Sequence, residues 1–136
     1  MKNRTLMLAM STAIALLAGT WAVESADAQA PGFKRVELQR HDLGTPGREA
    51  VVARAEFEPG ADVPRHTHPG EELGYVMKGE LILEIEGQPP AKLKAGDVFF
   101  VPAGAVHSAR NPGKSPAAVL ATYVIEKGKP VATPVK

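Results

Sequence analysis

Residues 60–79 read GADVPRHTHPGEELGYVMKG and residues 96–111 read GDVFFVPAGAVHSARN, and these two stretches decide the fold. Each contains histidine close to proline and glycine, the residues that most often turn a chain. The 16 residues between the stretches include Leu81, Leu83 and Ile85, which share one face of an extended chain. The pattern predicts short β-strands that meet at tight corners, with the histidines near those corners.

Apolar residues with a period of two continue on both sides of these stretches. The predicted strands cover residues 51–57, 73–77, 80–86, 98–101, 106–110 and 117–125. Residues 30–41 are expected to add an edge strand, and residues 127–136, with two prolines and three lysines, are expected to be frayed. No stretch keeps a helical period over three turns without glycine or proline. The sequence therefore predicts one all-β sandwich or barrel.

Composition excludes several classes of site. The chain has 136 residues, with 16 Lys and Arg against 15 Asp and Glu, so its formal net charge is +1. This balance indicates no nucleic acid partner, because such partners need a strongly basic surface. Cysteine is absent, which excludes disulfides, thiolate metal sites and thiol nucleophiles. Of the four histidines, His41 lies outside the two stretches and is expected at the surface, which leaves three for chemistry.

The first 30 residues have the three-part layout of a secretory signal peptide. The positively charged residues 1–4 precede an uncharged run over residues 5–23, and small residues flank Gln29 as at a cleavage site after Ala30. The alternative is an uncleaved membrane anchor, because the run approaches the ~20 residues that a spanning helix needs. We expect cleavage, with a single domain over residues 31–136 that is periplasmic or secreted and free of the membrane.

Four side chains in the two stretches form a candidate metal-ligand set. His66 and His68 are two residues apart, so both imidazoles point to one face of a strand. Glu72 follows across a Pro-Gly turn that can bring its carboxylate back to the same centre, and His107 lies just after a Pro-x-Gly corner. Three imidazoles and one carboxylate suit one divalent ion of iron, manganese, nickel, copper, cobalt or zinc.

The spacing of these residues resembles the two motifs of the cupin superfamily. The residues that match the first motif are Gly60, His66, His68, Glu72 and Gly79. The residues that match the second motif are Gly96, Pro102, Gly104, His107 and Asn111. Ten identities at fixed offsets make the resemblance specific, and it is closest to the short quercetin-dioxygenase-like cupins.

This resemblance implies a fold, a metal site and an assembly. The fold is a double-stranded β-helix, or jelly-roll, barrel, and the implied metal ligands are His66, His68, Glu72 and His107. Small cupins often pair through a sheet, so a homodimer is one implied assembly. Ile82, which is expected to face outward, fits such pairing.

Each candidate ligand also has a plainer interpretation. His66 and His68 could be solvated loop residues. His107 could lie at a barrel rim, bonded only to the backbone. Glu71 could replace Glu72 as the ligand, although the spacing favours Glu72.

The interior around the metal is expected to be mostly apolar. The candidate wall residues are Val51, Ala53, Phe57, Val76, Leu81, Leu83 and Phe99. The candidate polar residues of the interior are Arg54, Arg65 and Thr122. Such a pocket favours a small, partly apolar organic molecule over a sugar phosphate.

Two functions fit these residues. The first is a dioxygenase-like enzyme in which the metal is a Lewis acid or oxygen activator, and in which Glu72, the only anionic ligand, can also act as a catalytic base. The second is a periplasmic binding or sensing module that captures a small ligand or a metal without turnover. An empty structural barrel fits less well, because all four ligand residues are present.

Overall fold

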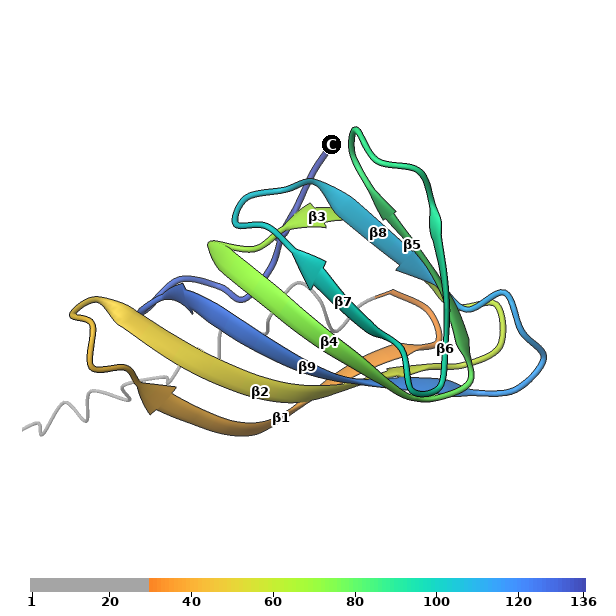
Figure 1. Cartoon of the computed structure of the whole chain (residues 1–136), viewed down its shortest axis with the longest axis horizontal. Helices are drawn as coiled ribbons and strands as arrows, with labels where there is room; N and C mark the ends of the chain where they lie inside the picture. The colour runs from red at the N-terminus through yellow and green to blue at the C-terminus, as the bar shows by residue number, and fades with distance from the viewer. Residues whose placement is uncertain (1–29) are drawn as a thin grey trace, which may run out of the picture.

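The computed structural model describes residues 30–136, and within that range it contains ten β-strands and no helix (Figure 1). The strands are β1 (Phe33–Asp42), β2 (Arg48–Phe57), β3 (Asp62–Thr67), β4 (Gly70–Lys78), β5 (Glu80–Ile85), β6 (Ala91–Lys94), β7 (Val98–Val101), β8 (His107–Arg110), β9 (Ala117–Glu126) and β10 (Thr133–Pro134). The predicted signal peptide, apart from Ala30, lies outside the described residues. In the described part of the chain, nothing qualifies as a helix able to cross a membrane.

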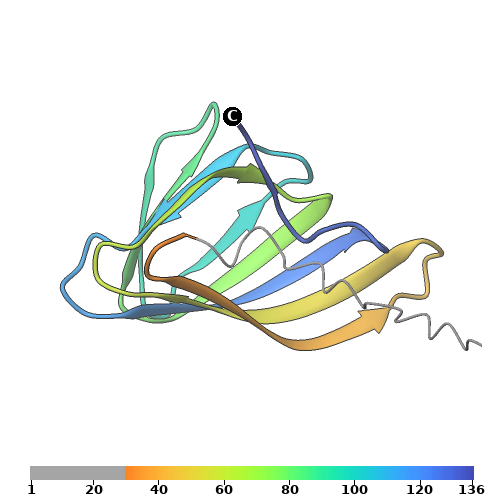
Figure 2. The same ribbon diagram turned by 180° about the vertical axis from the view of Figure 1, so that it is seen from behind.

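The strands form two antiparallel sheets of five strands each, which confirms the all-β prediction. One sheet has the order β1-β2-β9-β4-β7 and the other the order β10-β3-β8-β5-β6. In Figures 1 and 2 the long strands β2, β9 and β4 run side by side, and β8 and β5 lie across the interior from them. β1 is an edge strand, as the sequence predicts for this part of the chain.

The alternation of side chains along β2 shows why these residues form a strand. Every second residue of β2, from Glu49 to Phe57, is buried, and the residues between them are half-exposed. β2 pairs with β1 on one side and with β9 on the other, so its backbone groups are satisfied along its whole length. At its end β4 connects to β5 through Gly79, whose φ of 76° lies in the left-handed region that glycine adopts without strain.

The hydrophobic core lies between the two sheets and is rich in alanine. Its buried members include Phe33, Val51, Ala53, Ala55, Phe57, Val76, Leu81, Ala117, Val119, Ala121, Tyr123 and Ile125. Each large aliphatic or aromatic side chain stabilises the fold by about 1.5–3 kcal/mol through burial. The alanines are too small to fill the interior, which leaves room between the sheets for polar side chains and a cavity.

The C-terminal residues are docked on the barrel, so the prediction of a frayed end is wrong. Thr133 and Pro134 pair with Thr67 and His66 of β3, and Ala132 is buried. Composition could not reveal this, because the docking is through backbone groups at the free edge of β3. The short strands β3, β6 and β10 also lie outside the predicted strand ranges, because each contains at most one large apolar side chain.

Candidate metal centre

Three of the four histidines converge in the interior, although they come from different parts of the chain. His66 is near the end of β3, His68 lies just beyond that strand, and His107 begins β8. β3 and β8 pair so that His66 lies opposite His107. The ring centroids are 4.2 Å apart for His66 and His107, 4.8 Å for His68 and His107, and 4.9 Å for His66 and His68.

A backbone carbonyl holds the Nδ1 atom of each imidazole. The Nδ1 atoms of His66, His68 and His107 lie 2.8, 2.6 and 2.9 Å from the carbonyl oxygens of Pro64, Val131 and Ala105. A carbonyl oxygen only accepts hydrogen bonds, so each Nδ1 must carry and donate a proton. In the neutral rings every Nε2 is then left with a lone pair, which is the form that binds metals.

Glu72 completes the cluster from the opposite sheet. Its Oε2 atom lies 3.1 Å from the Nε2 atom of His68 and 3.4 Å from that of His107. Burial alone would raise the pKa of Glu72, but the close imidazoles of His107 and His68 outweigh burial and hold the pKa well below its ordinary value. Glu72 is therefore a buried carboxylate that keeps its negative charge.

This cluster needs a positive charge at its centre. The candidate ligand atoms of the three histidines lie within 4.8 Å of one another, and the three side chains are buried. The Nε2 atom of His107 is buried without a hydrogen-bond partner. Lone pairs of neutral imidazoles would face each other and the carboxylate of Glu72, which is unfavourable unless a proton or a metal ion lies between them. The donor set and its geometry thus fit a borderline divalent metal.

The buried position of His66 makes the stability of the metal-free protein depend on pH. Burial, aided by the nearby His107, lowers the pKa of His66 from 6.5 to about 4. The unfolded chain takes up a proton on this residue near pH 6.5 and the folded chain only near pH 4, so falling pH favours unfolding across that window. The free energy of unfolding is expected to fall by about 2 kcal/mol from pH 7 to pH 5 through His66.

Denaturant unfolding at pH 7 and at pH 5, with a chelator present to keep the protein free of metal, measures this effect. His66→Asn removes the titrating group and is expected to remove most of the difference. An equally large pH dependence in His66→Asn would show that other groups cause it.

The other candidate residues lie away from the cluster. Glu71, the alternative to Glu72, points to the outside, where its carboxylate lies 2.7 Å from Arg48. His41 is exposed on β1, as expected.

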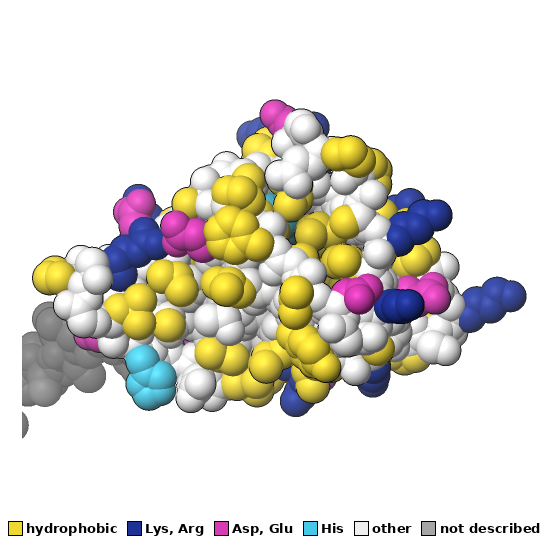
Figure 3. Space-filling view, in the orientation of Figure 1, with side chains coloured by type: hydrophobic (Ala, Val, Ile, Leu, Met, Phe, Trp, Pro, Cys, Tyr) yellow, Lys and Arg dark blue, Asp and Glu magenta, His cyan; other side chains and the backbone are white. Residues whose placement is uncertain are grey.

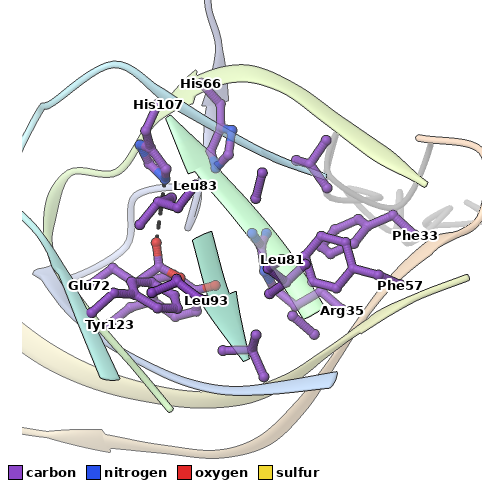
Figure 4. A pocket seen from close by; sticks show the side chains of 15 residues that line it. Phe33, Arg35, Phe57, His66, Glu72, Leu81, Leu83, Leu93, His107 and Tyr123 are labelled. Carbon is purple, nitrogen blue, oxygen red and sulfur yellow. Dashed lines mark ion pairs between the residues drawn. The ribbon is translucent and has the colours of Figure 1, made fainter. Parts of the chain in front are cut away.

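A cavity of about 40 Å³ adjoins the cluster and is lined by His66, Glu72 and His107 together with apolar side chains (Figure 4). It has room for a molecule of a few heavy atoms. The predicted wall residues that line it are Phe57, Leu81, Leu83 and Phe99. The other predicted wall residues, Val51, Ala53 and Val76, are fully buried in the core instead.

The polar residues expected in the interior are not among those that line this cavity. Arg54, Arg65 and Thr122 each stand next to an inward-facing residue in their strands and therefore point outward. The guanidinium of Arg54 pairs with Glu56, and that of Arg65 with Glu86. Each of the three is next to an apolar or histidine residue that faces inward. The alternation of faces along a strand could therefore have shown, from the sequence, that all three point outward.

Sequence reasoning missed two polar residues that do line the cavity, Arg35 and Tyr123. Tyr123 lies opposite Glu72 in the β4–β9 register, and its ring centroid is 4.8 Å from that of His68. Burial raises the pKa of Tyr123 far above its ordinary value, the charge of Glu72 adds to the rise, and Arg35 opposes it. Tyr123 thus stays protonated beside the cluster.

Comparison with curated proteins finds plant relatives over part of the chain. The chain is 42% identical over 77 residues to germin-like protein subfamily 2 member 2 of Arabidopsis thaliana, which covers 53% of this chain and 35% of the relative. It is 36% identical over 88 residues to oxalate oxidase 2 of Hordeum vulgare, covering 59% and 39% of the two chains. The chain therefore spans less than half the length of these relatives.

Solved structures share the fold over more of the chain. Oxalate oxidase in complex with the substrate analogue glycolate superposes with a TM-score of 0.64 at 29% identity, covering 82% of this chain and 60% of that one. The DMSP lyase DddQ of Ruegeria pomeroyi DSS-3 also has a TM-score of 0.64, at 25% identity, and covers 76% and 51% of the two chains. These likenesses confirm the jelly-roll fold.

The family model for the cupin domain matches residues 53–123. This range is more than half of the 136-residue chain and includes both motifs and all four residues of the cluster. The chain belongs to the cupin family.

Proposed function

We propose that this cupin is a secreted metalloenzyme that acts on a small oxygen-bearing organic molecule by an oxidase- or dioxygenase-like reaction. One divalent transition metal would be held by His66, His68, Glu72 and His107. The observation that carries the proposal is the set of three Nδ1 hydrogen bonds to backbone carbonyls, which turns three Nε2 lone pairs toward one point beside a charged carboxylate. Secretion is proposed from the signal-peptide pattern of residues 1–30.

The bound metal, the three histidines and Glu72 would each have a different role. A bound metal would supply Lewis acidity toward a substrate oxygen and, if it is redox-active, activation of dioxygen. The histidines contribute neutral nitrogen donors, and Glu72 contributes the negative charge that draws a cation into a buried site. Because its pKa is low, Glu72 is a weak base and would accept only a strongly acidic proton, such as that of a carboxyl group.

The cavity and the relatives support a small substrate. A volume of about 40 Å³ excludes large ligands from the space beside the cluster. One similar curated protein is an oxalate oxidase, and so is one similar solved structure. That structure contains glycolate, a two-carbon hydroxy acid. We therefore propose a small organic acid or enol as the substrate class, with the apolar walls packing against its carbon atoms.

A second copy of the chain is the proposed partner of the outer face of β4, β7 and β9. Large apolar side chains are exposed there, and Figure 3 shows apolar side chains gathered on this side of the molecule. They are Leu73, Tyr75, Met77, Val98, Phe100 and Leu120. An apolar patch of this kind is typical of a protein–protein interface. Ile82, by contrast, is half-buried, so it does not mark the proposed dimer face.

The full chain, expressed with its leader in a bacterial host and loaded with manganese, iron, copper or zinc, tests the proposal. Native mass spectrometry is expected to show a chain that begins at Pro31, one metal per chain and a dimer. At least one redox-active metal is expected to support dioxygen uptake with oxalate or glycolate, whereas zinc is not, because it has no redox chemistry.

Two neighbouring carboxylates provide a matched pair of variants. Glu72→Gln is expected to lose metal affinity and turnover, and Glu71→Gln to keep both, because Glu71 lies outside the cluster. Stoichiometric metal without turnover across all metals and substrates would overturn the enzyme proposal in favour of a binding or sensing module. Equal activity of the two variants would overturn the assignment of Glu72.

A further inference from the structure

The residues after β9 cross from one sheet to the other. β9 ends at Glu126, and the chain then reaches the edge of β3, where β10 pairs with the last two residues of that strand, His66 and Thr67. The dark blue trace that ends at the mark C in Figures 1 and 2 shows this path. Residues 131–136, here named the C-terminal segment, thus lie against the strand that carries His66 and leads to His68.

One carbonyl of the C-terminal segment holds His68. The carbonyl oxygen of Val131 lies 2.6 Å from the Nδ1 atom of His68. His66 and His107 instead bond to carbonyl oxygens only two residues before them, so the local backbone orients those two rings. The partner of His68 is 63 residues away in the sequence. The orientation and the tautomer of His68 therefore depend on whether the C-terminal segment is docked.

Few contacts hold the C-terminal segment on the barrel. Ala132 is buried and Val131 is half-buried against the core, whereas residues 133–136 are exposed. Beyond the pairing of β10 with β3, the N–H of Val135 donates to the carbonyl oxygen of Arg65 at 2.9 Å. A segment that buries so little apolar surface opens at a small cost in free energy. An interaction that is made only in the docked state can therefore shift its equilibrium.

We propose that Val131 is a positioning residue of the metal site, and that docking of the C-terminal segment and binding of the metal favour each other. The docked carbonyl fixes the proton of His68 on Nδ1, which leaves the lone pair on Nε2, the atom that faces Glu72. When Nε2 binds a cation, Nδ1–H becomes a stronger donor to Val131. Such coupling is reciprocal, so the segment raises metal affinity by the same factor by which the metal favours docking.

The inference rests on the proposed function, since it concerns the same metal site. It adds to that site a part of the chain that lies outside both cupin motifs and acts through one backbone carbonyl.

Zinc titration in competition with a chelating dye measures what the C-terminal segment contributes to affinity. Ala132→Lys puts a long charged side chain at a buried position, so it is expected to undock the segment and raise the Kd of zinc about ten- to a hundredfold. A chain that ends at Pro130 is expected to show the same increase. The matched control is Val135→Lys, which is expected to bind zinc as the unmodified protein does, because Val135 is exposed.

The same change in a second background shows whether the effect passes through His68. His68→Ala removes the imidazole that Val131 holds and leaves His66, His107 and Glu72 as ligands, so its Kd for zinc is already higher. Adding Ala132→Lys to this variant is expected to leave that Kd unchanged. A segment that only supported the fold would weaken zinc binding by the same factor in both backgrounds. Equal factors would therefore overturn the inference.

Amide hydrogen exchange of the unmodified protein, followed by NMR, tests the coupling in the other direction. The amide of Val135 reports docking, because it donates to Arg65 of β3. Saturating zinc is expected to slow its exchange by the factor found in the titration, about ten- to a hundredfold. The amide of Leu43, which donates to Arg48 in the connection between β1 and β2, is the control and is expected to exchange at an unchanged rate.

The outcomes separate this inference from the proposed function. Zinc that binds without slowing the exchange of Val135, or that binds equally well to Ala132→Lys, would overturn the inference and leave the proposed function standing. Failure of the unmodified protein to bind zinc would instead overturn the proposed function.

Discussion

Replacing His66 and His68 together with alanine is expected to abolish stoichiometric binding of a divalent metal. The double variant removes two of the three converging nitrogen donors and leaves His107 with Glu72, too few ligands to hold a borderline divalent ion tightly. Elemental analysis after dialysis against a trace of free metal measures the stoichiometry. One metal per chain in the double variant would mean that the metal binds elsewhere.

Metal-dependent stability separates lost binding from lost folding. Metal at one hundred times its Kd is expected to stabilise the unmodified protein by about 2.7 kcal/mol and the double variant not at all. The far-ultraviolet circular dichroism of the double variant is expected to stay β-type, because the core between the sheets is untouched. His41→Ala is the matched control, since His41 is exposed, and it is expected to bind metal normally.

Gly70→Ala is expected to have the largest effect on stability, a loss of about 3 kcal/mol. A Cβ atom at Gly70 would lie 2.0 Å from the carbonyl oxygen of Val124 and 2.7 Å from the Cα atom of Ile125. Both atoms belong to the backbone of β9, so the clash can be relieved only if β4 and β9 separate. Gly70 lies between His68 and Glu72 in the sequence, so the same movement is expected to weaken metal binding.

Denaturant unfolding monitored by circular dichroism measures the effect of Gly70→Ala. Gly44→Ala is its control, because no atom lies within 4 Å of a Cβ built at Gly44. The control is expected to change the free energy of unfolding by less than about 0.5 kcal/mol. Equal stability of the two variants would contradict the close packing of β4 on β9.

The sequence predicts the strands and the cluster well because both depend on short-range patterns. The period of two along β2 places Ala53 and Ala55 inward, and the structure agrees. The offsets of His66, His68 and His107 indicate a common centre, and the structure brings these three side chains together. Glycine at position 79 indicates a positive φ at the turn after β4, which is also found.

Features that depend on contacts between distant segments could not be predicted in this way. The period of two indicates that Val51 faces inward, but it does not indicate how far along the barrel the cavity extends. Val51 lies in the packed core and does not line the cavity. Val131 fixes the tautomer of His68 through its carbonyl oxygen, although 63 residues separate them. Arg35 lines the cavity from a position opposite Ala55 of β2, a relation between two strands rather than within one.

Local hydrogen bonds orient the imidazoles of the proposed metal site. Pro64 and Ala105 each lie two residues before the histidine they hold, so part of the geometry follows from the local backbone path. The third carbonyl comes from the docked C-terminal segment, which makes the orientation of His68 depend on the folded barrel. These bonds would hold the three imidazoles turned toward one metal ion, which would lower the cost of binding it.

Anomalous diffraction from crystals of the zinc-loaded protein, recorded on both sides of the zinc absorption edge, tests the central claim most directly. The account predicts one anomalous peak per chain, within bonding distance of the Nε2 atoms of His66, His68 and His107 and of the carboxylate of Glu72. A peak coordinated by other residues, or none at this cluster under saturating zinc, would contradict it.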